Sequence, residues 1–136
     1  DADGADGWAM LAVGAPRMAV RVTSGRLKEY SEASPRGRMA LAGLAGLGRI
    51  GGETLRDAAE DAGVDFRARS RWAVAIADAA RRGEKGTVAL LAAAGMQTTS
   101  WNRMPPEHLY HIVAALHRVG LNPEARMIAA EAIMRS

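Results

Sequence analysis

Residues 113–120, Val-Ala-Ala-Leu-His-Arg-Val-Gly, share a pattern with two earlier stretches of the chain. Residues 44–51 read Leu-Ala-Gly-Leu-Gly-Arg-Ile-Gly, and residues 76–83 read Ile-Ala-Asp-Ala-Ala-Arg-Arg-Gly. Each stretch has a branched apolar residue followed by alanine, then leucine or alanine two places on, and it closes with Arg-x-Gly. The closing glycines are 32 and 37 residues apart, so the pattern indicates an internal repeat.

The repeat predicts three helix ends. Glycine can take the left-handed conformation that closes a helix, and the arginine two places earlier would face the negative end of the helix dipole. A second helix is expected after each glycine, because a period in this range is typical of stacked helical hairpins. One hairpin alone leaves an apolar face exposed, so neighbours must stack to bury it. We therefore predict an all-α fold of about three stacked helical hairpins, an α-solenoid-like right-handed array.

Composition and periodicity agree with this prediction. Hydrophobic residues make up 49% of the chain but aromatic residues only 4%, a mixture that favours helix over strand. No segment shows the alternation of a half-buried strand. Ser70 and Asn122 are predicted N-caps, and Pro105 or Pro106 is expected in a first helical turn. Helices are predicted over residues 38–49, 53–62, 71–82, 87–94, 105–119 and 123–135.

The N-terminal part of the chain has a weaker pattern. Residues 1–7, acidic and rich in glycine, are predicted to be disordered or a linker. One or two helical turns are expected over residues 8–13, and weak helices over residues 17–22 and 25–30. The predicted organisation is a flexible or partly helical N-terminal segment, residues 1–37, followed by a helical-repeat domain, residues 38–136. Because the chain begins with Asp1 rather than methionine, we expect an excised domain or a processed product.

The layout of residues 38–136 resembles tetratricopeptide-type and related α-solenoid repeats. The resemblance is one of architecture, because the Trp-x2-Leu-Gly-x2-Tyr signature is absent and the spacing is irregular. It implies a protein that binds peptides or other proteins on a concave face, and it assigns no binding residue. The predicted function is a protein–protein interaction or scaffolding module of a larger bacterial protein, with the partner in a groove between hairpins. The bacterial origin is inferred from the abundance of alanine, glycine and arginine, a bias typical of GC-rich genomes.

Seven residues are candidates for contact with a partner. Trp101 and Met104 are apolar residues in an otherwise polar loop. They either pack beneath the loop between two hairpins, which is the preferred interpretation, or serve as exposed anchors. The full predicted set is Trp101, Met104, His108, Tyr110, His111, Arg67 and Arg71.

An alternative function is a basic helical module that binds nucleic acid or another polyanion. The net charge is +3 and the pI is about 9.9. Arginine beside an aromatic residue can contact phosphates while the ring stacks on a base. Two small basic clusters fit this description, and the second leads into Trp72; they are Arg36 with Arg38, and Arg67 with Arg69 and Arg71.

Neither an enzyme nor a cofactor is predicted. His108 and His111 share a helix face and His117 lies two turns later, but no full metal-ligand set accompanies them. Residues 83–87 lack the Gly-Lys-Ser/Thr order of a phosphate loop. The acidic run of residues 57–61 is interpreted as a solvated face or as a docking patch for a basic partner. Catalysis is not predicted there, because the sequence supplies no nucleophile or oxyanion site beside it.

The sequence also limits the compartment. It contains no cysteine, so disulfides and thiolate sites are excluded. No apolar run reaches the length of a membrane span. We expect a soluble protein of the cytoplasm or the periplasm, with no assignment between the two.

Overall fold

The computed structural model describes residues 2–17, 34–97 and 100–136 of the chain. Within these residues the secondary structure is helical and contains no strand, so the predicted all-α class is confirmed. None of the helices described is both long and apolar enough to cross a membrane. The α-helices are α1 (Ala2–Gly14), α3 (Pro35–Gly46), α4 (Gly52–Ala62), α5 (Arg71–Arg81), α6 (Lys85–Gln97), α7 (Pro106–Arg118) and α8 (Asn122–Arg135), with a short 3-10 helix, η1 (Trp101–Arg103).

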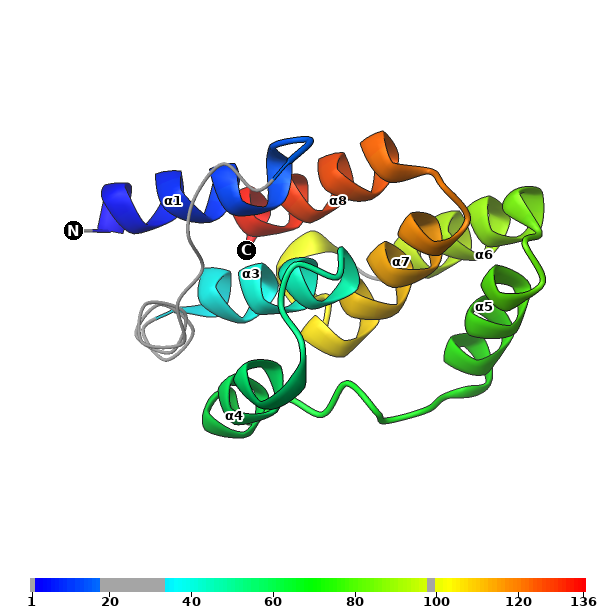
Figure 1. Ribbon diagram of the computed structural model, residues 1–136, viewed down its shortest axis with the longest axis horizontal. Coiled ribbons are helices and arrows are strands. Elements are labelled where there is room, and N and C mark those ends of the chain that lie inside the picture. The colour runs from blue at the N-terminus through cyan, green and yellow to red at the C-terminus, as the bar shows by residue number, and fades with distance from the viewer. Residues whose placement is uncertain (1, 18–33, 98–99) are drawn as a thin grey trace.

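Helices α3 and α7 pack against each other at the centre of the fold (Figure 1). Helices α1 and α8 pack on α3 from one side, and α8 also contacts α7. The pair α5–α6 packs on α7 from the other side. Helix α4 contacts α3 and projects away from the other helices (Figure 1).

Two of the three predicted glycines lie in the turns of helical hairpins. Helix α5 packs on α6, and helix α7 packs on α8. The turn of the first of these hairpins contains Gly83, with φ of 72°, and the turn of the second contains Gly120, with φ of 87°. At the first repeat the prediction is wrong in detail. Gly51 has an extended backbone, and the left-handed residue that follows α3 is Gly48, with φ of 69°. Arg49 therefore lies beyond the helix, whereas Arg81 and Arg118 lie in the last turns of α5 and α7 as predicted.

The packing order of the units differs from their order along the chain. Helix α7 contacts α3 of the first unit and both helices of the second unit, α5 and α6. The third unit, α7–α8, thus lies between the first and the second. The short connections place α5 beside α6 and α7 beside α8. The longer connection from α4 to α5 allows the first and second units to lie apart, with the third unit between them.

The N-terminal helix belongs to the same core as the rest of the fold. The prediction of a linker over residues 1–7 is wrong from Ala2 onward, since α1 begins there. Trp8 is 7% exposed, and Ala9, Ala12 and Val13 are fully buried. The predicted boundary after residue 37 falls inside α3. Apart from Arg17, the weak helices predicted over residues 17–30 lie outside the described residues.

The predicted caps are confirmed in part. The Ser70 hydroxyl accepts a hydrogen bond from the Ala73 amide at 3.1 Å, and Pro106 begins α7. Asn122 is the first residue of α8 rather than its N-cap, which is Leu121. The helix therefore starts one residue earlier than predicted, and the Asn122 side-chain oxygen is buried without a hydrogen-bond donor.

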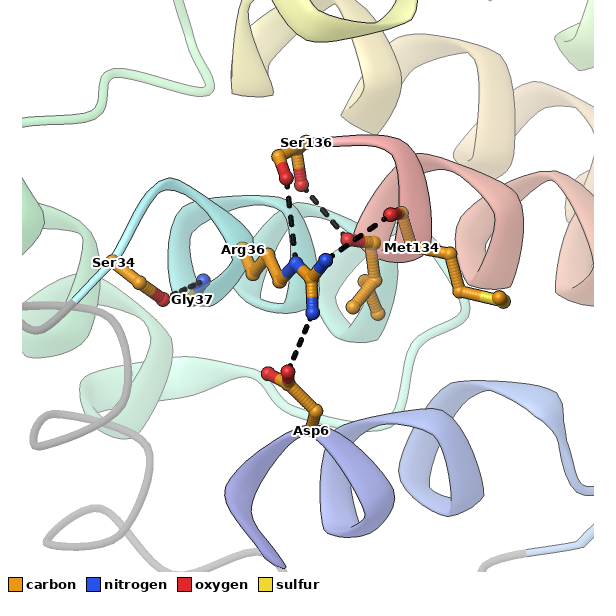
Figure 2. A network of polar contacts seen from close by, with 7 residues as sticks. Asp6, Ser34, Arg36, Gly37, Met134 and Ser136 are labelled. Carbon is orange, nitrogen blue, oxygen red and sulfur yellow. Dashed lines mark hydrogen bonds and ion pairs between the residues drawn. The ribbon is translucent and has the colours of Figure 1, made fainter. Parts of the chain in front are cut away.

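An arginine at the start of α3 joins three helices (Figure 2). The Arg36 guanidinium forms an ion pair with Asp6 of α1 at 2.6 Å. It also donates to the main-chain oxygens of Met134 and Ser136 at the end of α8, at 3.4 and 3.3 Å. At the other end of α1, Arg49 donates to the carbonyls of Ala12 and Ala15. Two arginines therefore hold α1 against the core.

Substitution of Gly46 tests the packing of α3 on α7. A Cβ at Gly46 would lie 2.8 Å from the Val113 side chain and 3.0 Å from the Ala114 amide nitrogen. We expect Gly46→Ala to lower the free energy of unfolding by about 1–3 kcal/mol, measured by urea denaturation. A Cβ at the exposed Gly7 of α1 would meet nothing within 4 Å. Gly7→Ala should therefore raise stability by about 0.5–1 kcal/mol. An unchanged free energy of unfolding in Gly46→Ala would contradict this account of the packing.

Substitution of Arg36 tests how α1 is held. The Arg36 side chain is 41% exposed, so solvent screens its ion pair with Asp6. We expect Arg36→Met to lower the free energy of unfolding by about 1 kcal/mol and to speed amide hydrogen exchange in α1. Arg38→Met is the matched control, because Arg38 is exposed on the same helix and forms no ion pair within the described residues. Equal exchange rates in the two variants would contradict the role of Arg36.

Candidate partner-binding surface

The connection between α4 and α5 runs across the N-terminal half of α7. The His111 ring donates from Nε2 to the Ala68 carbonyl at 3.3 Å. The Asp65 amide donates to the Glu107 carboxylate at 3.4 Å. The Phe66 and Tyr110 rings pack with centroids 4.8 Å apart. The connection is therefore held on α7 by side chains from little more than one turn of that helix.

A hollow of about 490 Å³ lies between α4 and this connection, and we name it the α4 hollow. Its apolar lining comes from both sides, with half-buried Leu55 and Ala59 from the helix and Val64 and Phe66 from the connection. Each side also supplies one positive and one negative side chain. The complete lining is Gly52, Leu55, Arg56, Ala59, Glu60, Val64, Asp65, Phe66 and Arg67.

A second, smaller hollow of about 320 Å³ lies on the other side of the connection, and we name it the histidine hollow. It is bounded by the first residues of α5 and by the first two turns of α7. Its lining is Ala68, Arg69, Ser70, Trp72, Ala73, Pro105, Glu107, His108 and His111.

Trp72 and His108 hold three helices together at the histidine hollow. Their rings stack at 4.1 Å with an angle of 13° between the planes. The Trp72 indole donates to the Leu91 carbonyl at 2.8 Å, and His108 donates to the Gly95 carbonyl at 2.9 Å. A Cβ at Gly95 would lie 2.6 Å from the Trp72 ring, so only glycine allows this stacking on α6. One face of Trp72 and one nitrogen of His108 are thus already occupied within the fold.

His111 is half-buried beside the connection, and its environment changes its basicity. Burial lowers the pKa of His111 below the usual 6.5, because an imidazolium is costly to desolvate. Its hydrogen bond to Ala68 and the nearby Glu107 act in the opposite direction, while His108 and Arg69 lower the pKa further. No cluster of three metal-ligating side chains occurs in the part of the chain that the structure describes.

The structure brings most of the predicted partner-binding residues together. Arg67 lines the α4 hollow, and Tyr110 packs on Phe66, which lines it too. His108 and His111 line the histidine hollow, and Arg71 follows it at the start of α5. Exposed arginines and half-buried rings therefore gather around one connection.

Trp101 and Met104 lie away from this surface. The 3-10 helix that contains Trp101 packs on α8, and the Arg135 guanidinium lies 6.0 Å from the centre of the Trp101 ring. Met104 is 3% exposed and belongs to the hydrophobic core. Its burial favours the interpretation that Met104 packs beneath the loop.

Several residues of the α4 hollow were not predicted from the sequence. Leu55, Ala59 and Ala62 recur at helical spacing in an otherwise polar helix, which is the signal that could have found this face. The acidic residues of α4 are exposed, in agreement with a solvated face, and Glu60 alone among Asp57, Glu60 and Asp61 lines the hollow.

Comparisons of the chain with protein families, with curated proteins and with solved structures gave no match.

The lowered pKa of His111 predicts a pH dependence of stability. Between the pKa of His111 in the folded chain and 6.5, the unfolded chain binds more protons than the folded chain. The contribution of neutral His111 to stability is therefore complete above pH 6.5 and is lost as the pH falls through the pKa of the folded state. His111→Gln keeps an N–H donor for Ala68 but does not titrate. We expect the urea midpoint of the unsubstituted protein to fall more between about pH 7.5 and about pH 5 than that of the variant. An equal fall of the urea midpoint in the two proteins would contradict the assignment of this pH dependence to His111.

Proposed function

We propose that this chain is a protein–protein interaction module and that its partner binds at the α4 hollow. The observation that carries the proposal is an apolar helix side that the fold covers only in part. Ala58 is buried, whereas Leu55 and Ala59 are half-buried and line the hollow. An amphipathic helix gains its stability by burying such a face, so a partner that covers it would complete the packing of α4.

The arrangement of the hollow matches the anatomy of a protein interface. Interfaces combine an apolar centre with a polar, hydrated rim. Here the apolar centre is Leu55, Ala59, Val64 and Phe66, and the rim carries Arg56, Glu60, Asp65 and Arg67. A leucine or phenylalanine from the partner that becomes fully buried in such a hollow contributes about 1.5–3 kcal/mol. The rim charges would then fix the orientation of the partner more than the strength of binding.

The resemblance to tetratricopeptide-type repeats supports the same function. Proteins of that architecture bind peptides or other proteins, mostly on a concave surface. The α4 hollow lies between the first helical unit and the connection to the second, which is the kind of position that a groove between hairpins would take.

Binding of a polyanion is the second candidate. It is favoured by Arg69 and Arg71, which are exposed and form no ion pair within the described residues. It is weakened by Trp72, because the ring already stacks on His108 and half of its surface is therefore closed to a nucleic-acid base. Protein binding remains the better supported function.

A peptide selection tests the proposed function. A library of random peptides displayed on phage is selected against the immobilised chain, and the enriched peptides are assayed by fluorescence anisotropy. We expect peptides with a large apolar anchor, and we expect Ala59→Arg to weaken their binding at least tenfold because the new side chain fills the hollow.

The control variant is Asp57→Arg on the same helix, since Asp57 does not line the hollow. It should bind the selected peptides with unchanged affinity. Peptides that bind the chain and Ala59→Arg equally well would overturn the proposed site. Failure to enrich any peptide, together with steeply salt-dependent binding of a single-stranded oligonucleotide, would favour the second candidate instead.

A further inference from the structure

Helix α4 is the most peripheral element of the fold. Among the described helices it packs on α3, and within α4 itself only Ala58 is fully buried. The face toward the α4 hollow carries Gly52, Leu55, Arg56, Ala59 and Glu60, which follow one another at helical spacing. Gly52, Arg56 and Glu60 are exposed and Leu55 and Ala59 are half-buried, so this face is accessible to a second helix over part of its surface.

The charges on this face are arranged symmetrically. Arg56 and Glu60 lie two residues before and two residues after Ala58. Opposite charges four residues apart commonly pair on one helix. In the described part of the chain, however, neither Arg56 nor Glu60 forms an ion pair, and both side chains are exposed. Both charges are thus free to contact another molecule.

We propose that the partner bound at the α4 hollow is a second copy of this chain, with the two α4 helices antiparallel across a two-fold axis at the level of Ala58; this inference rests on the proposed function. The axis places Arg56 of one copy opposite Glu60 of the other, and Glu60 opposite Arg56. A self-complementary surface of this kind is what a two-fold interface requires. A positive or a negative surface alone would repel its own copy.

The apolar residues of α4 fit the same arrangement. Leu55 lies on the hollow face in the first half of α4. The antiparallel pairing therefore directs it toward the opposite end of the hollow in the second copy. That end is lined by Val64 and Phe66. Ala59, close to the axis, lets the two helices approach closely. Each copy therefore supplies one apolar anchor and one apolar pocket.

The dimer is expected to be weak. A stable interface buries about 800 Å² on each partner, and the proposed contact uses only one helix of 11 residues and the connection that follows it. Association should therefore depend on protein concentration. Sedimentation equilibrium of the full chain over a range of concentrations, at low and at high salt, measures it directly.

Charge reversal tests the pairing. Arg56→Glu gives each copy two negative charges at the interface and Glu60→Arg gives two positive charges, so each variant alone should dimerise about tenfold more weakly than the unsubstituted chain. A mixture of the two variants restores both pairs and should form a heterodimer. The double variant R56E/E60R also restores both pairs, in reverse, and should dimerise like the unsubstituted chain.

Asp57→Arg is the matched control for Glu60→Arg. It makes the same change of charge one turn away from the hollow face and should leave the dimer unchanged. All the substituted residues are exposed, so circular dichroism should show unaltered helix content. A dimer that persists in both single variants uses another surface, and this result would overturn the proposal. Single variants whose mixture fails to associate would do the same.

The outcome also separates this inference from the proposed function. A chain that stays monomeric at every concentration, but whose α4 hollow binds selected peptides, has a different protein as its partner. The second-copy inference then fails while the proposed function stands. A monomer that binds no peptide at the hollow loses both.

Discussion

The close approach of α3 to three neighbouring helices is the constraint on which the fold depends. A Cβ at Gly43 would lie 3.0 Å from the Ala129 side chain and 3.3 Å from Val13. One turn later, a Cβ at Gly46 would lie 2.8 Å from Val113. Two glycines on one helix thus let α1, α8 and α7 reach the α3 backbone. Because dispersion contacts are made only at close range, this small-residue packing substitutes for the large aromatic side chains that the core largely lacks.

The position of α7 follows from that constraint and in turn shapes the candidate surface. Since α7 lies against α3, its first two turns meet the connection that returns from α4 to α5. His111 and Tyr110 hold this connection, and α4 is left outside it with a space between them. The α4 hollow is therefore a consequence of central packing. A change that moves α7 would alter the hollow without touching any residue that lines it.

Local signals made the helices predictable, whereas the arrangement of the units required contacts that no local pattern encodes. Gly83 and Gly120 follow the first helices of their units, α5 and α7, as the repeat predicts. The first unit contains several glycines close together, and the repeat alignment could not show that Gly48 rather than Gly51 takes the left-handed conformation. The location of the third unit between the other two depends on Gly46 fitting Val113, a match between residues far apart in the sequence.

The candidate surface was predictable to a similar extent. Arg67 and His111 are predicted from their chemistry, and the fold brings them to the same connection. Met104 is predicted as an apolar residue in a polar loop, but burial depends on the neighbours that the fold supplies, and here they enclose it. The sequence does not single out Leu55, because one leucine in a mostly polar helix is an ordinary core residue unless the space beside it is known to be open.

The chemistry of the α4 hollow limits how it can discriminate between partners. Its apolar lining includes the small side chains of Ala59 and Val64, which leave space for apolar anchors of different shapes. Discrimination must then come from the rim, where each side carries both signs of charge. A uniformly acidic or basic partner would meet repulsion at half of these positions, whereas a partner with alternating charges in the right register would meet none. The sequence of α4 supplies one such pair of opposite charges, Arg56 and Glu60, one turn apart.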